Sequence, residues 1–213
     1  MRKFRPDLHL LTMLTYYGLF RKDDLKNLRG IHFNFGNNTL HLPGHLVKKT
    51  LNKKTIVMVP EFVALLKEFG IDKLGPQERV LCAWTFGGKV TRILPENWKP
   101  TLENVRKMFP TVPADKLERL QSKAKVNYHI GRGTFSRLHK AEIDKIGLTR
   151  KNGTVPTFYC WKHTGACSYI DSGYDLVWVK NQAGHSTLAA TNAYLEKMPV
   201  NRKDLYNIIT QKK

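Results

Sequence analysis

An apolar stripe at helical spacing opens the chain, with Leu8, Leu11 and Leu14 on one face. The stripe predicts a helix from residue 7 that breaks near Gly18, because glycine weakens a helix interior. Similar helical stretches follow along the chain, and several of them end at a glycine. They predict helices over residues 22–28, 61–69, 115–125, 134–146, 157–172, 175–182, 186–195 and 202–209.

Residues 30–59 show a different pattern, in which apolar and polar positions alternate. Two alternating runs, 31–35 and 40–42, flank the turn-forming residues 36–38, and a third run covers 55–59. This spacing is typical of half-buried strands joined by short turns. The pattern predicts a three-stranded antiparallel sheet.

Residues 71–113 contain five prolines, and we expect only short helices between them. No internal repeat, low-complexity run or long linker divides the chain. We therefore expect a single domain over residues 1–213. Its fold class is expected to be α+β, mainly α, with one small antiparallel sheet.

The charge of the chain adds a functional prediction. Lys and Arg number 36 and Asp and Glu number 17, which gives a formal charge of +19. The basic residues are spread along the chain, as expected of a folded surface that follows a phosphate backbone, although a basic surface that only aids solubility is the alternative. A hydrophobic content of 41% excludes wholesale disorder, and no apolar run approaches the about 18 residues of a membrane span. Nucleic acid is the favoured partner.

The cellular compartment is predicted from the chain start and the cysteines. The first residues lack the apolar run of a signal peptide. Three cysteines are too few, and odd in number, for a disulfide framework. We therefore expect a reducing, cytoplasmic location.

Candidate chemistry lies in five short segments that follow one another in order. Arg21 lies at the junction of the first two predicted helices, and Lys48-Lys49 lies at the edge of the predicted sheet. Tyr159-Cys160-Trp161-Lys162-His163-Thr164 begins a helix with cations and rings. Gly184-His185-Ser186 places a histidine at a helix start, and Tyr194 follows that histidine by nine residues.

In this order the segments resemble the motifs of the tyrosine recombinases, the family of phage integrases and site-specific recombinases. Gly18-Leu19-Phe20-Arg21 leads to an acid–leucine pair, Asp24-Leu25, which two residues separate from the arginine. The step from His185 to Tyr194 matches the family in length. Each motif alone is weak, but their co-occurrence over roughly residues 7–198 is specific. The resemblance implies a tyrosine recombinase-like catalytic domain around the small sheet. It also implies an N-terminal core-binding domain that we expect to be missing from this chain.

The resemblance implies a DNA strand transfer in which Tyr194 is the nucleophile and a 3′-phosphotyrosyl intermediate forms. Arg21, Lys162 and His185 would hold the phosphate, and Lys49 would protonate the leaving 5′ oxygen, with Lys48 as the alternative. The phosphotyrosyl bond stores the energy of the broken bond, so neither ATP nor a metal is expected, and no cofactor is implied. The sequence contains no acidic cluster that suggests a Mg²⁺ site.

Two positions depart from the family pattern of His-x-x-Arg. Lys162 stands where the family has arginine, which keeps the charge but loses the bidentate fork. Tyr159 stands where the family has histidine, and its hydroxyl can still donate to a phosphate oxygen. The Lys-His-Thr-Gly-Ala variant is similar to integrases of Bacteroidetes mobile elements and phages.

The resemblance also implies partners and a place of action. Double-stranded DNA, a homotetramer on that DNA and accessory DNA-bending proteins are expected, in the nucleoid of a bacterial host. Basic residues outside the catalytic set are candidates for contacts with DNA, namely Lys48, Lys53, Lys54, Arg132, Arg137 and Lys140.

Two other functions remain open at this point. A type IB-like topoisomerase shares the tyrosine chemistry and would relax supercoils without site preference. A non-catalytic DNA-binding relative is the second alternative, kept open by Tyr159 and Lys162. For single residues, Tyr194 could be a core aromatic, and Lys48, Lys49, Lys53 and Lys54 could contact phosphates only.

Overall fold

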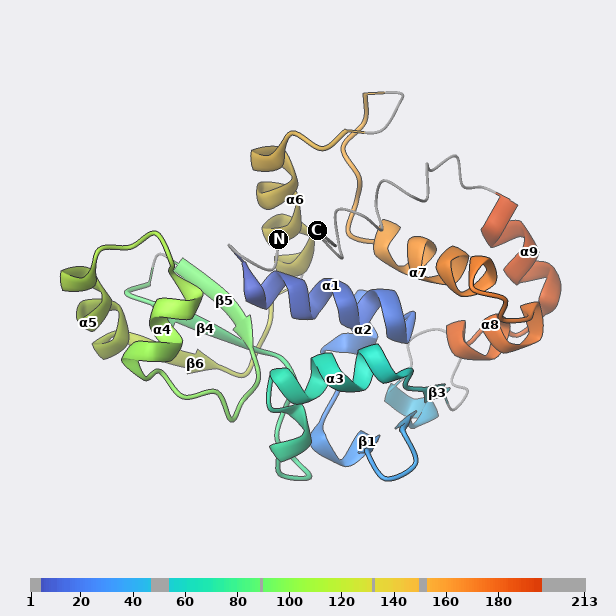
Figure 1. The fold of residues 1–213 in the computed structure, drawn as a ribbon, viewed down its shortest axis with the longest axis horizontal. Coiled ribbons are helices and arrows are strands. Elements are labelled where there is room, and N and C mark those ends of the chain that lie inside the picture. The colour runs from blue at the N-terminus through green and yellow to red at the C-terminus, as the bar shows by residue number, and fades with distance from the viewer. Residues whose placement is uncertain (1–4, 47–53, 89, 132, 150–152, 197–213) are drawn as a thin grey trace.

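Helix α1, Pro6–Gly18, runs through the middle of the molecule (Figure 1). The computed structural model describes residues 5–46, 54–88, 90–131, 133–149 and 153–196, with side chains up to residue 192. Nearly every residue of α1 is buried, so the helix is covered on all sides, as its dense apolar sequence requires. It packs against helix α7, Cys160–Asp171, helix α3, Pro60–Glu68, and strand β5, Val90–Leu94.

The predicted three-stranded sheet is confirmed. Its order is β1-β2-β3, with β1 at Phe33–Asn34, β2 at Thr39–Leu42 and β3 at Lys54–Val57, all antiparallel. The alternation places Leu40 and Ile56 opposite each other and buries both in the main core. The first strand was predicted over the run 31–35, but its first two residues belong to a 3-10 turn, Gly30–His32.

A second sheet, which the sequence analysis missed, has the order β5-β4-β6. Strand β4 is Cys82–Phe86 and β6 is Ala124–Asn127, and β4 pairs with both neighbours in antiparallel register. The predicted helix over 115–125 is therefore too long: helix α5, Ala114–Ser122, ends before β6 begins. Short helices were expected between the prolines of 71–113, and one of them is helix α4, Leu102–Met108.

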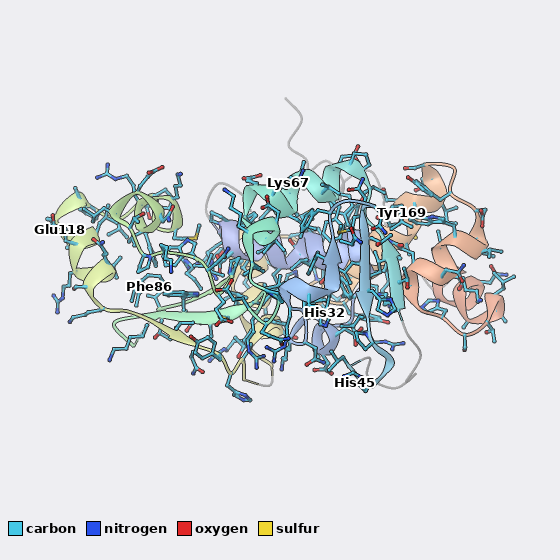
Figure 2. All side chains as sticks on the ribbon, turned by 90° about the horizontal axis from the view of Figure 1, so that it is seen from below. His32, His45, Lys67, Phe86, Glu118 and Tyr169 are labelled. Atoms are coloured by element: carbon cyan, nitrogen blue, oxygen red, sulfur yellow. The ribbon has the colours of Figure 1, made fainter. Side chains whose placement is uncertain are left out.

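The second sheet and helices α4 and α5 form a lobe with a core of its own. Figure 1 shows this lobe at one end of the molecule, and Figure 2 shows Phe86 and Glu118 there, far from Tyr169 at the other end. Its core is separate from the main one and includes Cys82, Trp84, Phe86, Leu94, Val105, Met108, Phe109 and Leu117. The chain thus divides its apolar side chains between two clusters.

The helices of the second half follow the prediction closely. They are α6 Thr134–Ile146, α7, α8 Leu176–Ala183 and α9 Leu188–Glu196, while α2 is Lys22–Leu25 near the start of the chain. The helix predicted over 202–209 lies outside the described residues. The α+β, mainly α fold class is confirmed, and no helix within the described residues is long and apolar enough to cross a membrane.

A glycine sets how closely α1 and α7 approach. A Cβ atom at Gly165 would lie 2.0 Å from the carbonyl oxygen of Tyr16 and 3.0 Å from a methyl carbon of Leu19. Any larger residue would push the two helices apart. This contact brings the start of α7, which carries Lys162, next to the end of α1 and the Arg21 segment.

Candidate functional site

Arg21 lies in the short turn between α1 and α2. Leu19 ends α1 in the left-handed conformation, with φ of 47°, which is uncommon for a branched residue. Arg21 then precedes α2, and its backbone N–H donates to the carboxylate of Asp24 over 3.1 Å. The side chain of Arg21 lines a cavity of about 600 Å³ together with Tyr159. The chain reversal therefore places Arg21 at a concave surface.

Lys54, the first residue of β3, is buried against the end of α1. Its side chain is only 3% exposed. The Nζ atom donates to the carbonyl oxygens of Gly18, at 2.8 Å, and Leu19, at 2.9 Å, and it lies 4.4 Å from the ring centre of Phe20. These carbonyls are at the negative end of the helix dipole, which stabilises a cation. Burial first, and then the charge of Lys162, hold the pKa of Lys54 well below its ordinary value.

Lys162 is buried in the first turns of α7. It is 1% exposed, and its Nζ atom donates to the carbonyl oxygen of Ala183, 3.2 Å away at the end of α8. The second buried lysine thus also faces the carbonyl end of a helix. Burial, followed by the charge of Arg21, lowers the pKa of Lys162 to about 7, while Asp24 acts in the opposite direction.

His185 follows the left-handed Gly184 that ends α8. Its Nδ1 atom is 3.0 Å from the hydroxyl of Thr191, and that hydroxyl donates to the carbonyl oxygen of Thr187 at 3.4 Å. The hydroxyl of Thr191 therefore ties the imidazole of His185 to the first turn of α9. Burial, and next the charges of Lys162 and Arg21, lower the pKa of His185 to about 4, so the ring is neutral at pH 7.

These residues form one cluster, which we call the cation cluster: Arg21, Lys54, Lys162 and His185. They come from four distant segments, and the charges of Arg21, Lys54 and Lys162 all lower the pKa of His185. Neither lysine forms an ion pair among the described residues, because both ammonium groups donate to main-chain oxygens. Asp24 is the one carboxylate whose charge is seen to act on these lysines among the described residues, so the cations outnumber it and leave a positive potential that attracts anions.

The three predicted phosphate ligands, Arg21, Lys162 and His185, all belong to this cluster, but Lys162 differs from the prediction in its exposure. Lys162 lies beneath the surface at 1% exposure, whereas direct contact with phosphate was predicted. Tyr159 is 43% exposed, at the start of α7, and its ring makes an edge contact with His163 at 4.8 Å. It lines the same cavity as Arg21, so the structure brings these two predicted residues together.

The remaining predicted residues have different positions. Lys54 was predicted to contact DNA from the surface, and its burial shows that this assignment was wrong. Arg137 and Lys140 are exposed on α6, where Lys140 pairs with Asp144 at 2.7 Å. The side chain of Tyr194 lies outside the description, although its backbone belongs to α9. Four predicted residues lie outside the described residues, namely Lys48, Lys49, Lys53 and Arg132.

Sequence reasoning missed two contributors to the site. One is the cluster role of Lys54, which the alternation of strand 54–57 could have indicated, since Lys54 shares the buried face with Ile56. The other is Thr191, which is fully buried and binds His185 from one turn into α9. No group of three or more metal-ligating side chains is close enough to hold an ion within the part of the chain that the structure describes.

Comparison with solved structures finds recombinases and integrases. The chain is similar to the crystal structure of XerA recombinase, with a TM-score of 0.49 and 18% identity over 95% of this chain. It is also similar to the Tn1549 transposon integrase in complex with circular intermediate DNA, with a TM-score of 0.47 and 11% identity over 93% of this chain. A variant of that integrase complex gives a TM-score of 0.45 and 13% identity.

The neighbours are of the kind that the sequence resemblance predicted, and the likeness is a coarse one of fold. This chain spans 56% of the length of each of these proteins. It matches no protein-family model, and no curated protein matches it.

Proposed function

We propose that this chain is the catalytic domain of a site-specific DNA recombinase or integrase with a tyrosine nucleophile. The observation that carries the proposal is the convergence of Arg21, Lys162 and His185 from three distant segments, so close that their charges act on one another. Arg21 also lines a cavity together with Tyr159. Helix α9 begins three residues after His185 and contains Tyr194. The formal charge of +19 supports double-stranded DNA as the substrate.

In the proposed reaction, the oxygen of Tyr194 attacks a DNA phosphorus and the bond to the 5′ oxygen breaks. The 5′ oxygen takes a proton from Lys49, with Lys48 as the alternative, and a 3′-phosphotyrosyl bond holds the cleaved strand. A 5′ hydroxyl from a second strand then attacks that bond and releases Tyr194. No net bond energy is lost, so the cycle needs no energy source.

The cation cluster would act on the charge that develops at phosphorus. Arg21 and Tyr159 line the cavity and would donate to the non-bridging oxygens, while Lys162 adds positive potential from below. A bound phosphate would raise the pKa of Lys162 from its value of about 7, so that the lysine becomes fully charged when DNA is present. Neutral His185 would act as the base that takes the proton of Tyr194 as the tyrosine oxygen attacks phosphorus.

The further partners follow from the same proposal. Strand exchange between two duplexes needs four cleavages, so we propose that a homotetramer acts on DNA, assisted by accessory DNA-bending proteins. The origin in a phage or other mobile element and the site of action in a bacterial cell are parts of this proposal.

A suicide-substrate assay tests the proposal. Nicked duplexes carrying the ends of the DNA element that encodes the chain are incubated with the protein, and the covalent adduct is measured. We expect an adduct in wild type and none in Tyr194→Phe. Tyr128→Phe is the matched control, because Tyr128 is 51% exposed on a segment after β6. Arg21→Ala is expected to slow adduct formation by about 10²–10³-fold.

Other results would favour the other functions. DNA binding without an adduct on any such duplex would indicate the non-catalytic relative. Relaxation of an unrelated supercoiled plasmid by a monomer would indicate the topoisomerase.

A further inference from the structure

Lys54 occupies a place where two turns of the site meet. On one side, its ammonium group donates to the carbonyl oxygens of Gly18, the last residue of α1, and of Leu19, which caps that helix. Leu19 has a φ of 47°, a conformation that costs a branched residue free energy unless its surroundings hold it. Two charge-assisted hydrogen bonds at this point stabilise the turn that leads to Arg21.

On its other side, the stem of Lys54 packs against the turn that leads to His185. A Cβ atom at Gly184 would lie 3.5 Å from Cδ and 3.8 Å from Cε of Lys54. Gly184 has a φ of 68°, and His185 follows with its N–H donating to the carbonyl oxygen of Lys180 at 3.0 Å. One side chain therefore touches both segments that carry the proposed phosphate ligands.

We propose that Lys54 is a positioning residue that fixes the Arg21 turn and the His185 turn relative to each other. This inference rests on the proposed function for the meaning of Arg21 and His185. Lys54 itself does not reach the phosphate, because it is 3% exposed and its donors point at main-chain oxygens. An apolar side chain of equal length would fill the space but leave both carbonyl groups without this donor.

The variant Lys54→Met tests the proposal by two measurements. The first is amide hydrogen exchange without any ligand: we expect faster exchange at residues 20–22 and 185–186 in the variant, and unchanged exchange in the second lobe. The second is the affinity for inorganic phosphate, followed by NMR, which we expect to fall about tenfold. Lys67→Met is the matched control, since Lys67 is an exposed lysine on α3, labelled in Figure 2. Lys67→Met also removes one lysine, and its amide exchange rates and phosphate affinity should stay within about twofold of wild type.

A folded Lys54→Met protein with wild-type exchange at both turns would overturn the positioning role, even if its melting temperature falls. Loss of phosphate affinity with unchanged exchange would overturn it as well, because Lys54 would then act through its charge alone. Lys54→Gln keeps one donor and is measured in the same way if Lys54→Met does not fold.

The proposed function is tested separately through Arg21→Ala. If wild type and Arg21→Ala bind phosphate equally, the phosphate site of the proposed function is wrong. The exchange measurement still decides whether Lys54 holds the two turns.

Discussion

Among the described residues, the buried lysines and arginines lie in two regions whose electrostatics differ. Near the start of α1, Arg5 and Arg92 lie around the fully buried carboxylate of Asp7, with Arg5 forming two hydrogen bonds to it at 2.9 and 2.8 Å. Burial lowers the pKa of Arg5, but its hydrogen bond with Asp7 and the charge of Asp7 outweigh this, and the pKa is raised overall. In the cation cluster, Lys54 and Lys162 donate to main-chain carbonyl oxygens at helix ends, and burial lowers the pKa of each although the charge of Asp24 acts in the opposite direction.

The difference lies in how closely a carboxylate is bound. Asp7 accepts directly from Arg5 and also from the backbone N–H of Ile93 in β5, at 3.1 Å, so it joins α1 to the second sheet, while burial still lowers the pKa of Arg92 to about 10. In the cation cluster, the charge of Asp24 favours both ammonium groups but does not outweigh their burial. Buried charge thus serves stability in one region and, we propose, phosphate binding in the other.

The largest expected effect comes from removing the carboxylate of the first region. Asp7→Asn leaves Arg5 and Arg92 buried without their counter-charge, and we expect the free energy of unfolding to fall by about 3–5 kcal/mol. Urea denaturation measures this. The control Asp144→Asn breaks an exposed pair with Lys140 and should change stability by less than about 0.5 kcal/mol. Equal effects of the two variants would contradict the comparison.

Removing a lysine from the cation cluster should raise the free energy of unfolding, whereas Asp7→Asn lowers it. Lys162→Met replaces a buried, unmatched ammonium with an apolar side chain of similar length, and we expect stability at pH 6 to rise by about 1–3 kcal/mol. Phosphate binding and adduct formation should fall in the same protein. A variant that loses both stability and binding would show that Lys162 is a structural residue like Arg5.

The smallest expected effect is a pH dependence of the free energy of unfolding, which also arises from the burial of Lys162. The pKa of Lys162 is about 7 in the folded chain, whereas the ordinary lysine value, which applies to the unfolded chain, is 10.5. Between these two pH values the unfolded chain therefore binds a proton at Lys162 that the folded chain does not bind. Stability therefore rises with pH through this window and is independent of this group below it. Denaturation of wild type and Lys162→Met at pH values of about 6, 8 and 10 tests it. The advantage of Lys162→Met should shrink as pH rises, and a constant advantage would exclude this cause.

The local parts of the fold could be predicted from the sequence. Helix α6 has the predicted bounds, because its apolar stripe and the left-handed Gly147 that ends it are local features. The first sheet also follows from alternation and short turns. The second sheet could not be predicted in the same way, because β4 pairs with β6 across about forty residues, with Thr85 opposite Lys125. Such pairing depends on long-range contacts and not on a short pattern.

The candidate site likewise has features that the sequence predicts and features that only the tertiary structure decides. By itself the sequence determined which residue types occur in which order: an arginine at a helix junction, a Lys-His-Thr segment, a Gly-His-Ser turn, and a tyrosine nine residues further on. Only the tertiary structure decided that Lys54 and Lys162 are buried under the site, because burial depends on which helix ends meet there. A lysine in a sequence carries the same charge everywhere, but its pKa and its role depend on the neighbours that the fold supplies.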